Sequence, residues 1–424
     1  MARARIALRT MQPAVISAVL LLGACAAGDS PADAIVVRDS AGLVIVENDL
    51  QGLDATCRVG AAPNVSIGVA EGAAEEQLYR VFGARRMNDG RIALVNQGSQ
   101  ELRFFDQQGR FVSKTGRRGG GPGEFRDAFH LWVLPGDTIW VGDYRPWRYL
   151  VFGPDGEFVR TVVPEPLYVN SPSAMTVLGD GRPVLGRETR DLGGGTRFEP
   201  RHIAIVVHRP DGSLADTIGV YPNGRWGQME DHQSAMFIFP LFESFMHLTS
   251  IGDLVAIGHG SAAELSLLAG DSALRVQRIV RWTTADRAIS SREIDAERRR
   301  IAAPYADMPA ADRRRFVDPL VSPERPVADR FPAFNRLIGG RDGRLWVREF
   351  PLPSAPARHR WLAFDAAGRF QCAAAMPAFN QVLELGDDYL LVLDRDELGV
   401  ERVLQYRLGR PGETIDDDAR PAER

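Results

Sequence analysis

A strand-and-turn unit of roughly 45 residues recurs along most of the chain, and this repeat constrains the fold more than any other feature of the sequence. In each copy an apolar strand leads to a Gly/Asp turn, a second strand, a loop, and a third strand that ends at another glycine turn. The first turns fall at residues 90, 137, 181, 253, 343 and 388. Asp-Gly between short β-branched or aromatic runs predicts type I′ hairpins, because such turns need positive φ.

A repeat of this length with three to four strands is typical of one blade of a β-propeller. The clearest copies span 86–111 and 131–158, and the two long gaps between turns are interpreted as insertions. The alternative, a two-sheet sandwich with many hairpins, does not explain why every copy repeats the same order of turns. We therefore predict an all-β fold, a six-bladed β-propeller over 78–410.

The stretch 116–125, Gly-Arg-Arg-Gly-Gly-Gly-Pro-Gly-Glu-Phe, followed by the second copy, resembles an NHL repeat. Together with the late stretch 394–403, it makes the chain similar to the six-bladed β-propeller lipoproteins that bacteria export. The similarity covers nearly all of 35–410. It implies the fold but no particular function, because such propellers include enzymes, binding proteins and scaffolds.

The N-terminus has the pattern of an export signal. Three arginines precede a short apolar run at 14–22, which is too short to span a membrane as a permanent helix. The run ends in Leu-Gly-Ala-Cys, which resembles the lipobox of bacterial lipoproteins. This predicts a signal peptide over 1–24 and a lipidated N-terminus at Cys25; the alternative is an ordinary signal peptide in which Cys25 is incidental. Ala26 implies outer-membrane anchoring, on the periplasmic face.

Cys57 and Cys372 are a disulfide candidate in such an oxidising compartment, and the alternative is two buried thiols. Strand-like segments at 35–38, 43–47 and 65–69 precede the first repeat, so 25–77 is predicted to hold the ring-closing strands. Pairing one of these strands with the last blade removes the exposed edge of an open ring. It would also bring Cys57 near Cys372, on the outer strand of the fifth blade.

Residues 285–330 break the repeat. Ser290 and Glu293 form a possible capping box for a short amphipathic helix, and a second helix is expected over 309–317. This insertion is either a lid or partner surface, or a solvated flap. The polar, acidic stretch 411–424 is predicted to be a disordered tail.

Charge is nearly balanced, with 51 Lys and Arg against 55 Asp and Glu and a formal net charge of −4. The arginines are accompanied by carboxylates throughout the sequence. A nucleic-acid binder needs a basic face that releases counterions, so we expect no nucleic-acid partner.

Six polar positions are candidates for a site on one face of the disc. Counting six residues beyond each first turn gives Asn96, Asp143, Arg187, His259, Glu349 and Asp394. The three carboxylates, Asp143, Glu349 and Asp394, predict a site for one divalent cation, Ca or Mg, with Asn96 as a carbonyl ligand. The alternative is that each polar side chain bonds neighbouring backbone N–H groups of its own turn.

Enzyme sites known from similar propellers can be tested in the same register. NHL-like lyases hold zinc with histidines near the start of inner strands; counting seven residues back from each turn gives Gly83, His130, Ala174, Met246, Arg336 and Gln381. Only one of these is a histidine, which argues against that zinc site. A lactonase-like site with a carboxylate-bound cation stays open. No Gly-x-Ser-x-Gly motif supports a serine hydrolase.

The sequence thus favours a lipid-anchored, extracytoplasmic propeller that binds a ligand or protein, with a peptide, glycan or protein partner. The alternative is a metal-dependent hydrolase or lyase at the central channel. A scaffold for an envelope assembly is a third possibility and shares the features of the first.

Overall fold

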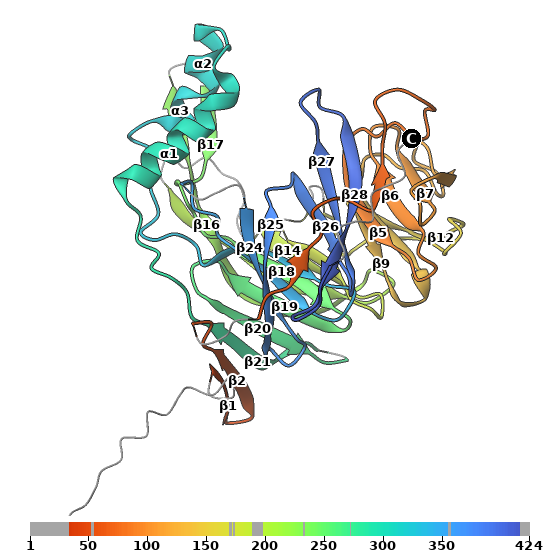
Figure 1. Cartoon of the computed structure of the whole chain (residues 1–424), viewed down its shortest axis with the longest axis horizontal. Helices are drawn as coiled ribbons and strands as arrows, with labels where there is room; N and C mark the ends of the chain where they lie inside the picture. Colours follow the sequence, from red (N-terminus) through yellow and green to blue (C-terminus); the bar gives the residue numbers. More distant parts are fainter. Residues whose placement is uncertain are drawn as a thin grey trace, which may run out of the picture.

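Six β-sheets surround a central channel like the blades of a propeller (Figure 1). This computed structural model describes residues 34–51, 55–168, 172, 174–188, 198–231, 234–271, 273–354 and 358–415. The predicted six-bladed β-propeller is confirmed. The signal peptide, Cys25 and residues 416–424 of the predicted tail lie outside the described residues.

Three blades are simple four-stranded antiparallel sheets. Blade 1 consists of β5 (Val81–Arg86), β6 (Ile92–Asn96), β7 (Glu101–Phe105) and β8 (Phe111–Thr115). Blade 2 consists of β9 (Ala128–Val133), β10 (Ile139–Asp143), β11 (Arg148–Phe152) and β12 (Phe158–Val162). Blade 5 consists of β22 (Phe334–Gly339), β23 (Leu345–Glu349), β24 (Arg358–Phe364) and β25 (Phe370–Pro377). The first strand of each is the innermost.

The other blades carry additions. Blade 3 consists of β13 (Met175–Val177), β14 (Pro183–Glu188), β15 (Glu199–His208), the long β16 (Leu214–Asp231) and β17 (Ser234–Ile238). Blade 4 consists of β18 (Met246–Ile251), β19 (Leu254–His259), β20 (Glu264–Ala269) and β21 (Arg275–Trp282), extended by β2 (Leu43–Asn48) and β1 (Ile35–Ser40). Blade 6 consists of β26 (Gln381–Leu385), β27 (Tyr389–Arg395) and β28 (Glu401–Gly409), with β4 (Val65–Ile67) and β3 (Arg58–Val59).

The hydrophobic core lies between blades rather than in one centre. Each of six buried clusters joins two neighbouring sheets; Phe104 of blade 1, for example, packs with Leu150 of blade 2, and Trp346 of blade 5 with Leu385 of blade 6. Both faces of the second strands, such as β6 and β10, are therefore buried, which explains their nearly continuous apolar runs.

The first turns of blades 1 to 5 contain a left-handed residue, as predicted, but the turn of blade 6 does not, and the turn of blade 1 is not of type I′. In blade 1 the Met87 N–H donates to the Arg91 carbonyl, and the Gly90 N–H donates to the Met87 carbonyl. Gly90 has a φ of 86° and is the only residue of this turn with positive φ. The pattern is a three-residue loop in which one left-handed glycine ends a type I turn.

The described N-terminal residues of 34–67 run along the outer edges of blades 4, 5 and 6, and we call them the N-terminal belt. β2 pairs in parallel with β21 of blade 4, Thr56 bridges to Ala373 of blade 5, and β4 pairs antiparallel with β28 of blade 6. The predicted ring closure by an N-terminal strand is confirmed for β4. The first two strands instead cover the outer edge of blade 4, which would otherwise be open to further pairing.

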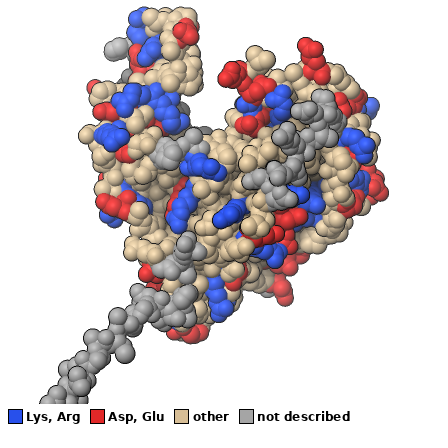
Figure 2. Space-filling view, in the orientation of Figure 1, with Lys and Arg blue, Asp and Glu red and all other residues tan. Residues whose placement is uncertain are grey.

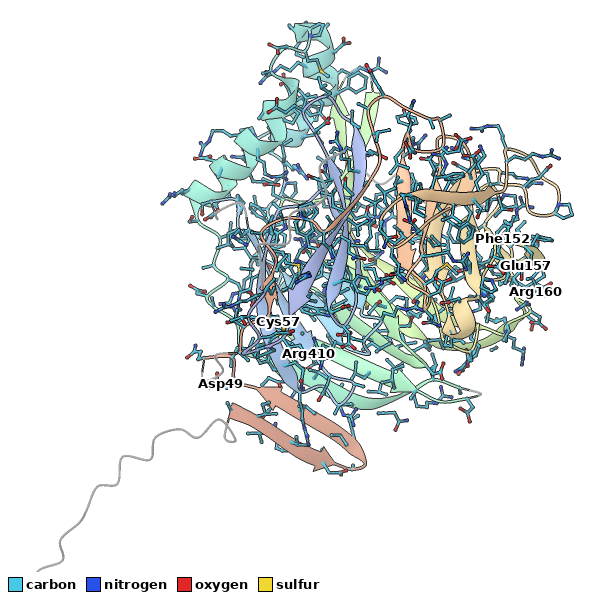
Figure 3. All side chains as sticks on the ribbon, turned by 45° about the vertical axis from the view of Figure 1, so that its right-hand side comes forward. Asp49, Cys57, Phe152, Glu157, Arg160 and Arg410 are labelled. Atoms are coloured by element: carbon cyan, nitrogen blue, oxygen red, sulfur yellow. A yellow bond between two sulfur atoms is a disulfide. The ribbon has the colours of Figure 1, made fainter. Side chains whose placement is uncertain are left out.

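A disulfide between Cys57 and Cys372 fastens the belt to blade 5, with the two Cα atoms 5.5 Å apart. Both residues are buried, and backbone hydrogen bonds between Cys57 and Ala373 and between Ala373 and Ala55 flank the bridge. Figure 3 shows Cys57 on the same side of the disc as Asp49 and Arg410. The predicted disulfide is thus present, on the outer strand of the fifth blade.

The insertion contains helices α1 (Ser291–Ala302), α2 (Ala310–Phe316) and α3 (Asp318–Val321). Ser290 caps α1 as predicted, accepting from the Glu293 N–H. The Glu293 carboxylate does not complete the capping box; it accepts hydrogen bonds from Ser354 of blade 5. Ile294 and Ile301 of α1 pack against a small core around Phe242 and Phe331.

The helices stand away from the disc on the side opposite the hairpin β1–β2 (Figure 1). Basic and acidic side chains are interspersed on the visible face of this insertion (Figure 2), so that face shows no single-sign patch.

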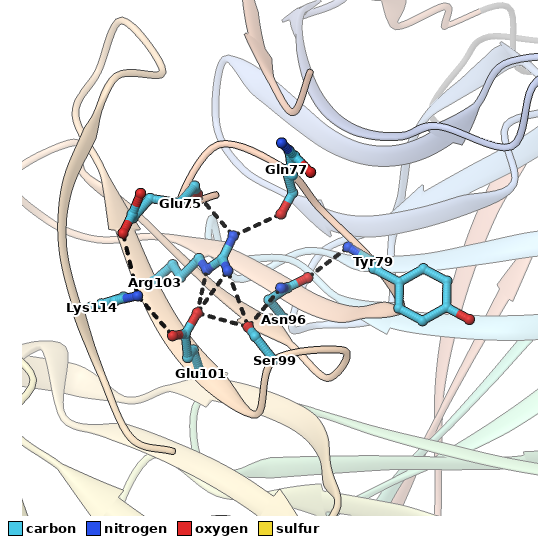
Figure 4. Close-up of polar contacts among 8 residues, drawn as sticks. All are labelled: Glu75, Gln77, Tyr79, Asn96, Ser99, Glu101, Arg103 and Lys114. Carbon is cyan, nitrogen blue, oxygen red and sulfur yellow. Dashed lines mark hydrogen bonds and ion pairs between the residues drawn. The ribbon is translucent and has the colours of Figure 1, made fainter. Parts of the chain in front are cut away.

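The segment between β4 and β5 carries the chain from blade 6 to blade 1 and is held by one buried arginine (Figure 4). The Arg103 guanidinium donates to the carbonyls of Glu75 and Gln77, 2.8 Å each. It also donates to the Glu101 carboxylate at 2.7–2.8 Å and to the Ser99 hydroxyl. Arg103 is 3% exposed, so these contacts are shielded from water.

Candidate functional site

The six predicted polar residues occupy equivalent places at the end of the second strand of each blade. Four are the last residue of that strand and two are the last but one, in the order Asn96, Asp143, Arg187, His259, Glu349 and Asp394. The register counted from the sequence is therefore correct in all six blades.

Two of these residues serve the chain crossings between blades. The Asn96 side chain accepts from the Tyr79 N–H at 2.8 Å, and the Asp143 carboxylate accepts from the Arg126 and Asp127 N–H groups. Asp143 is fully buried and also accepts from Arg148. These bonds match the backbone-bonding alternative, except that the N–H groups belong to the incoming crossing and not to the residue's own turn.

The predicted carboxylate metal site is not formed. In the described part of the chain, no three His, Cys, Asp or Glu side chains lie close enough to hold a metal ion together. Asp143 is committed to Arg148, and Glu349 accepts from Arg360 at 2.7 Å. The physical reason is topological: second strands lie one strand away from the axis, so their ends are spread around the ring.

A cavity of about 760 Å³ occupies the central channel. All six inner strands contribute to its wall. The polar and aromatic side chains among its lining residues are Phe82, Arg85, Asn88, His130, Trp132, Thr176, Thr249, Ser250, Arg336, Arg341, Gln381 and Glu384. Its charged lining side chains are thus three arginines and one glutamate.

Arg85 of β5 and Glu384 of β26 form the one ion pair within this lining, with 3.9 Å between Nε and Oε1. The other carboxylate oxygen of Glu384 accepts from the Arg86 N–H and the Tyr389 hydroxyl, at 2.7 and 2.9 Å. Burial raises the pKa of the Glu384 carboxyl, with Arg85 acting in the opposite direction. Glu384 is 4% exposed and offers little free negative charge to the cavity.

Arg336 of β22, in blade 5, also contacts β26, which Arg85 contacts from blade 1. Its Nη2 donates to the Val382 carbonyl at 3.0 Å, while Arg85 Nη1 donates to the Leu383 carbonyl at 2.6 Å. A bulge in β26 between Val382 and Glu384 explains how two consecutive carbonyls both reach arginines from the channel. The two guanidiniums are therefore held over adjacent peptide groups of one strand.

No carboxylate lies within 4.0 Å of Arg336 among the described residues, nor of its cross-strand neighbour Arg348. Arg348 lies one strand further out, and its Nε donates to Asn335. Burial, with the charges of Arg348 and Arg85, lowers the pKa of Arg336 to about 10. We call Arg336 and Arg348 the arginine cluster. It is cationic at neutral pH, and no carboxylate among the described residues compensates its charge within ion-pair distance.

Two histidines next to this cluster are held neutral. Burial, together with Arg85 and Arg336, lowers the pKa of His130 to about 4. Burial, together with His259, Arg348 and Arg336, lowers the pKa of His247 to about 4. A neutral imidazole can still donate one hydrogen bond to an anion.

Arg341 spans the channel at the end where the first turns lie. It comes from blade 5 and donates to Asp137 of blade 2 at 3.0 Å and to Asn88 of blade 1 at 2.6 Å. Blades 5 and 2 face each other across the ring, so this ion pair connects two opposite blades across the channel. Arg341 is satisfied by these contacts, unlike Arg336.

The cavity residues lie in a register that the sequence contains. Counting back from the turns places His130, Arg336 and Gln381 on or at the start of inner strands, and the structure confirms that all three line the channel. From the sequence, these inner-strand positions were considered only as possible zinc ligands, and so Arg336 was not identified as a site residue. An unusual arginine at such a position was the available signal for the cationic site. Arg85 gives no such signal, because the count places Gly83, and not Arg85, at this position of blade 1.

Comparison with known proteins supports the fold. Residues 75–163 match a protein family described as a 6-bladed beta-propeller. No curated protein matches the sequence. The described helices include none that is long and apolar enough to cross a membrane.

Among solved structures, the chain is similar to a protein from Bacteroides fragilis described as exported (13% identity, 86% of this chain and 99% of that one, TM-score 0.46). It is also similar to a member of a family of unknown function from Bacteroides vulgatus (10%, 84% and 99%, TM-score 0.45). A gluconolactonase from Xanthomonas campestris matches with 12% identity over 85% and 98% of the two chains and a TM-score of 0.38. Likenesses at this level show no shared site.

Proposed function

We propose that this protein is an extracytoplasmic binding module whose ligand occupies the central cavity. The observation that supports this proposal is the cavity itself: about 760 Å³, walled by all six inner strands, with hydrogen-bonding groups from several blades facing one space. Pockets of this size with a few convergent polar groups are the usual sites for small ligands.

The alternative, a hydrolase or lyase dependent on a Ca or Mg ion, has less support. A divalent cation in the cavity would face Arg85 and Arg336, and the one lining carboxylate, Glu384, is already paired. Repulsion between the metal ion and these two guanidinium groups would disfavour metal binding in this poorly solvated cavity. The residues present therefore do not fit a resident metal ion.

The test is native mass spectrometry of the purified protein after incubation with a small-molecule extract of the cell envelope. Gln381 lines the cavity at the start of β26, so Gln381→Trp would fill part of the space. We expect a ligand adduct on the unchanged chain, lost in Gln381→Trp and retained in Gln371→Trp, a matched change at an exposed position of β25. An adduct that survives in Gln381→Trp, or no adduct on any variant, would contradict the proposal.

We further propose that the protein is exported and anchored through lipid on Cys25. The export-signal pattern and the lipobox-like sequence support this. The first described residue, Ala34, leads into the hairpin β1–β2, on the opposite side of the disc from the insertion (Figure 1). An anchor nine residues before Ala34 would leave the helices facing away from the membrane.

Metabolic labelling with palmitate tests the anchor. We expect Cys25→Ser to lose the label completely and to shift the protein from the membrane to the soluble fraction, because the thiol is the attachment atom. Ala26→Ser, the matched neighbouring change, should keep both label and location. A chain that stays in the membrane fraction with Cys25 replaced would show that lipid is not the anchor.

A further inference from the structure

The cavity wall at the bulge of β26 is built for negative charge. Arg336 uses one nitrogen, Nη2, on the Val382 carbonyl, and its Nε and Nη1 have no hydrogen-bond partner among the described residues. These two nitrogens are not among the fully buried side-chain atoms that lack a partner. Both are therefore accessible, and they face the cavity that Arg336 lines. A guanidinium with its remaining donors exposed in a cavity is a ready recognition group for an oxyanion.

A second guanidinium lies beside it. Arg85 and Arg336 approach β26 from neighbouring blades and bind consecutive carbonyls, Leu383 and Val382. Like charges held together in a site with low dielectric repel each other, and burial adds to the cost. Burial and the charges of Arg348 and Arg85 lower the pKa of Arg336, in keeping with this repulsion. A bound anion would remove this repulsion.

The charge balance indicates how much negative charge the site accepts. Glu384 offsets Arg85, and Asp137 offsets Arg341. Arg336 in the wall and Arg348 directly behind it have no carboxylate within ion-pair distance among the described residues. Two positive charges are thus left uncompensated, and the group that matches them best carries two negative charges.

We propose that Arg85, Arg336 and His130 form a subsite for a compact doubly charged oxyanion, the phosphate group of a phosphate monoester. This rests on the proposed function and names the ligand class of the same cavity. Compactness follows from the adjacent carbonyls, which hold both guanidiniums within reach of one group. His130, neutral and next to both arginines, supplies a further donor without adding to their repulsion. The rest of the ligand would extend along the channel.

The test is isothermal titration of the purified protein with inorganic phosphate and glycerol phosphate at low ionic strength, where screening is weak. We expect both to bind, and acetate to bind at least about tenfold more weakly because it carries one charge. Arg336→Gln should weaken phosphate binding by about 30-fold, since it removes a charged hydrogen-bond donor. Arg348→Gln should weaken it only a few-fold, because Arg348 acts through its charge from outside the wall.

Arg110→Gln is the matched control, because Arg110 is an exposed arginine on blade 1, paired with Asp106. Phosphate binding should be unchanged in this variant. Arg336→Lys keeps the charge but loses the planar donor pair, so it should give an intermediate loss and preserves the test if Arg336→Gln does not fold. The proposal is wrong if acetate binds as well as phosphate, or if Arg336→Gln and Arg336→Lys bind phosphate as Arg110→Gln does.

Failure here is distinguishable from failure of the binding function. If an envelope ligand is lost on Gln381→Trp while phosphate does not bind, the cavity is a ligand site of another chemistry. If no envelope ligand is lost on Gln381→Trp but phosphate binding depends on Arg336, the proposed envelope-ligand function is contradicted while the anion subsite stands.

Discussion

Replacing Arg103 with methionine should lower the free energy of unfolding by about 3–5 kcal/mol, because it breaks a buried charged network by removing one partner. Hydrogen bonds from Ser99, Lys114 and Arg103 oppose the effect of burial and lower the pKa of the Glu101 carboxyl. Glu101 therefore remains ionised, with only Ser99 and Lys114 to compensate it. The carbonyls of Glu75 and Gln77 would lose their donor in the same step.

The location makes the loss larger than that of an isolated ion pair. Arg103 binds the segment that leads from β4, the closing strand of blade 6, into β5, the inner strand of blade 1. Loosening this segment weakens the seam at which the ring closes (Figure 4). We expect hydrogen exchange to increase first in β4 and β5, ahead of blades 3 and 4.

Urea unfolding of Arg103→Met beside Arg110→Met measures the effect. Arg110 lies on the same blade and pairs with Asp106 at 2.7 Å, but its side chain is 65% exposed. Such surface pairs contribute about 0–1 kcal/mol, so this variant should be nearly as stable as the unchanged chain. Equal losses in the two variants would show that the Arg103 network does not hold the closure.

The repeat could be predicted because it depends on local chemistry. A glycine with positive φ ends the turn at Gly90 and again at Gly181 and Gly343, and such residues are visible in one sequence. The ring-closing strand β4 and the disulfide followed from the need to close a ring. The predicted turn type was wrong because the same Asp-Gly sequence fits both a type I′ turn and a type I turn followed by one left-handed glycine.

The site could be predicted only as a register. Inner-strand positions such as Arg336 were identified by counting, but their chemistry depends on what neighbouring blades bring to the same space. Arg85 and Arg336 are separated by most of the chain and meet only because blade 6 lies between blades 5 and 1. The carboxylates chosen for a metal failed for the converse reason. Asp143 and Glu349 each form an ion pair with an arginine of their own blade and are not free to bind a metal ion.

Burial, together with the arginines of the channel, makes the stability of the protein sensitive to acid through two histidines, and this is the second large effect that we expect. His130 and His247 each have a pKa of about 4 in the folded chain, against an ordinary value of 6.5. Between these values the unfolded chain binds more protons than the folded one, so stability falls as the pH falls. The contribution of each histidine is complete above about pH 6.5 and is lost progressively toward pH 4.

From about pH 7.5 to about pH 5 the loss should be roughly 2 kcal/mol for each histidine, and about 4 kcal/mol for the two. Urea unfolding at both pH values measures it. Titrating carboxylates add to the total, so the informative quantity is the difference from His130→Gln/His247→Gln, which lacks both groups. That double variant should lose about 4 kcal/mol less over this range.

Arg336→Gln separates the electrostatic cause from burial. Arg336 lowers the pKa of both histidines, so removing its charge should raise both values and make the loss of stability on acidification smaller. Arg110→Gln changes the same net charge far from the channel and should keep the full pH dependence. If Arg336→Gln keeps it too, burial and the remaining charges near the histidines hold them neutral without Arg336. A shallower dependence in Arg336→Gln alone would show that the positive potential in the cavity, the property that would attract a phosphate, already acts on the histidines of the empty site.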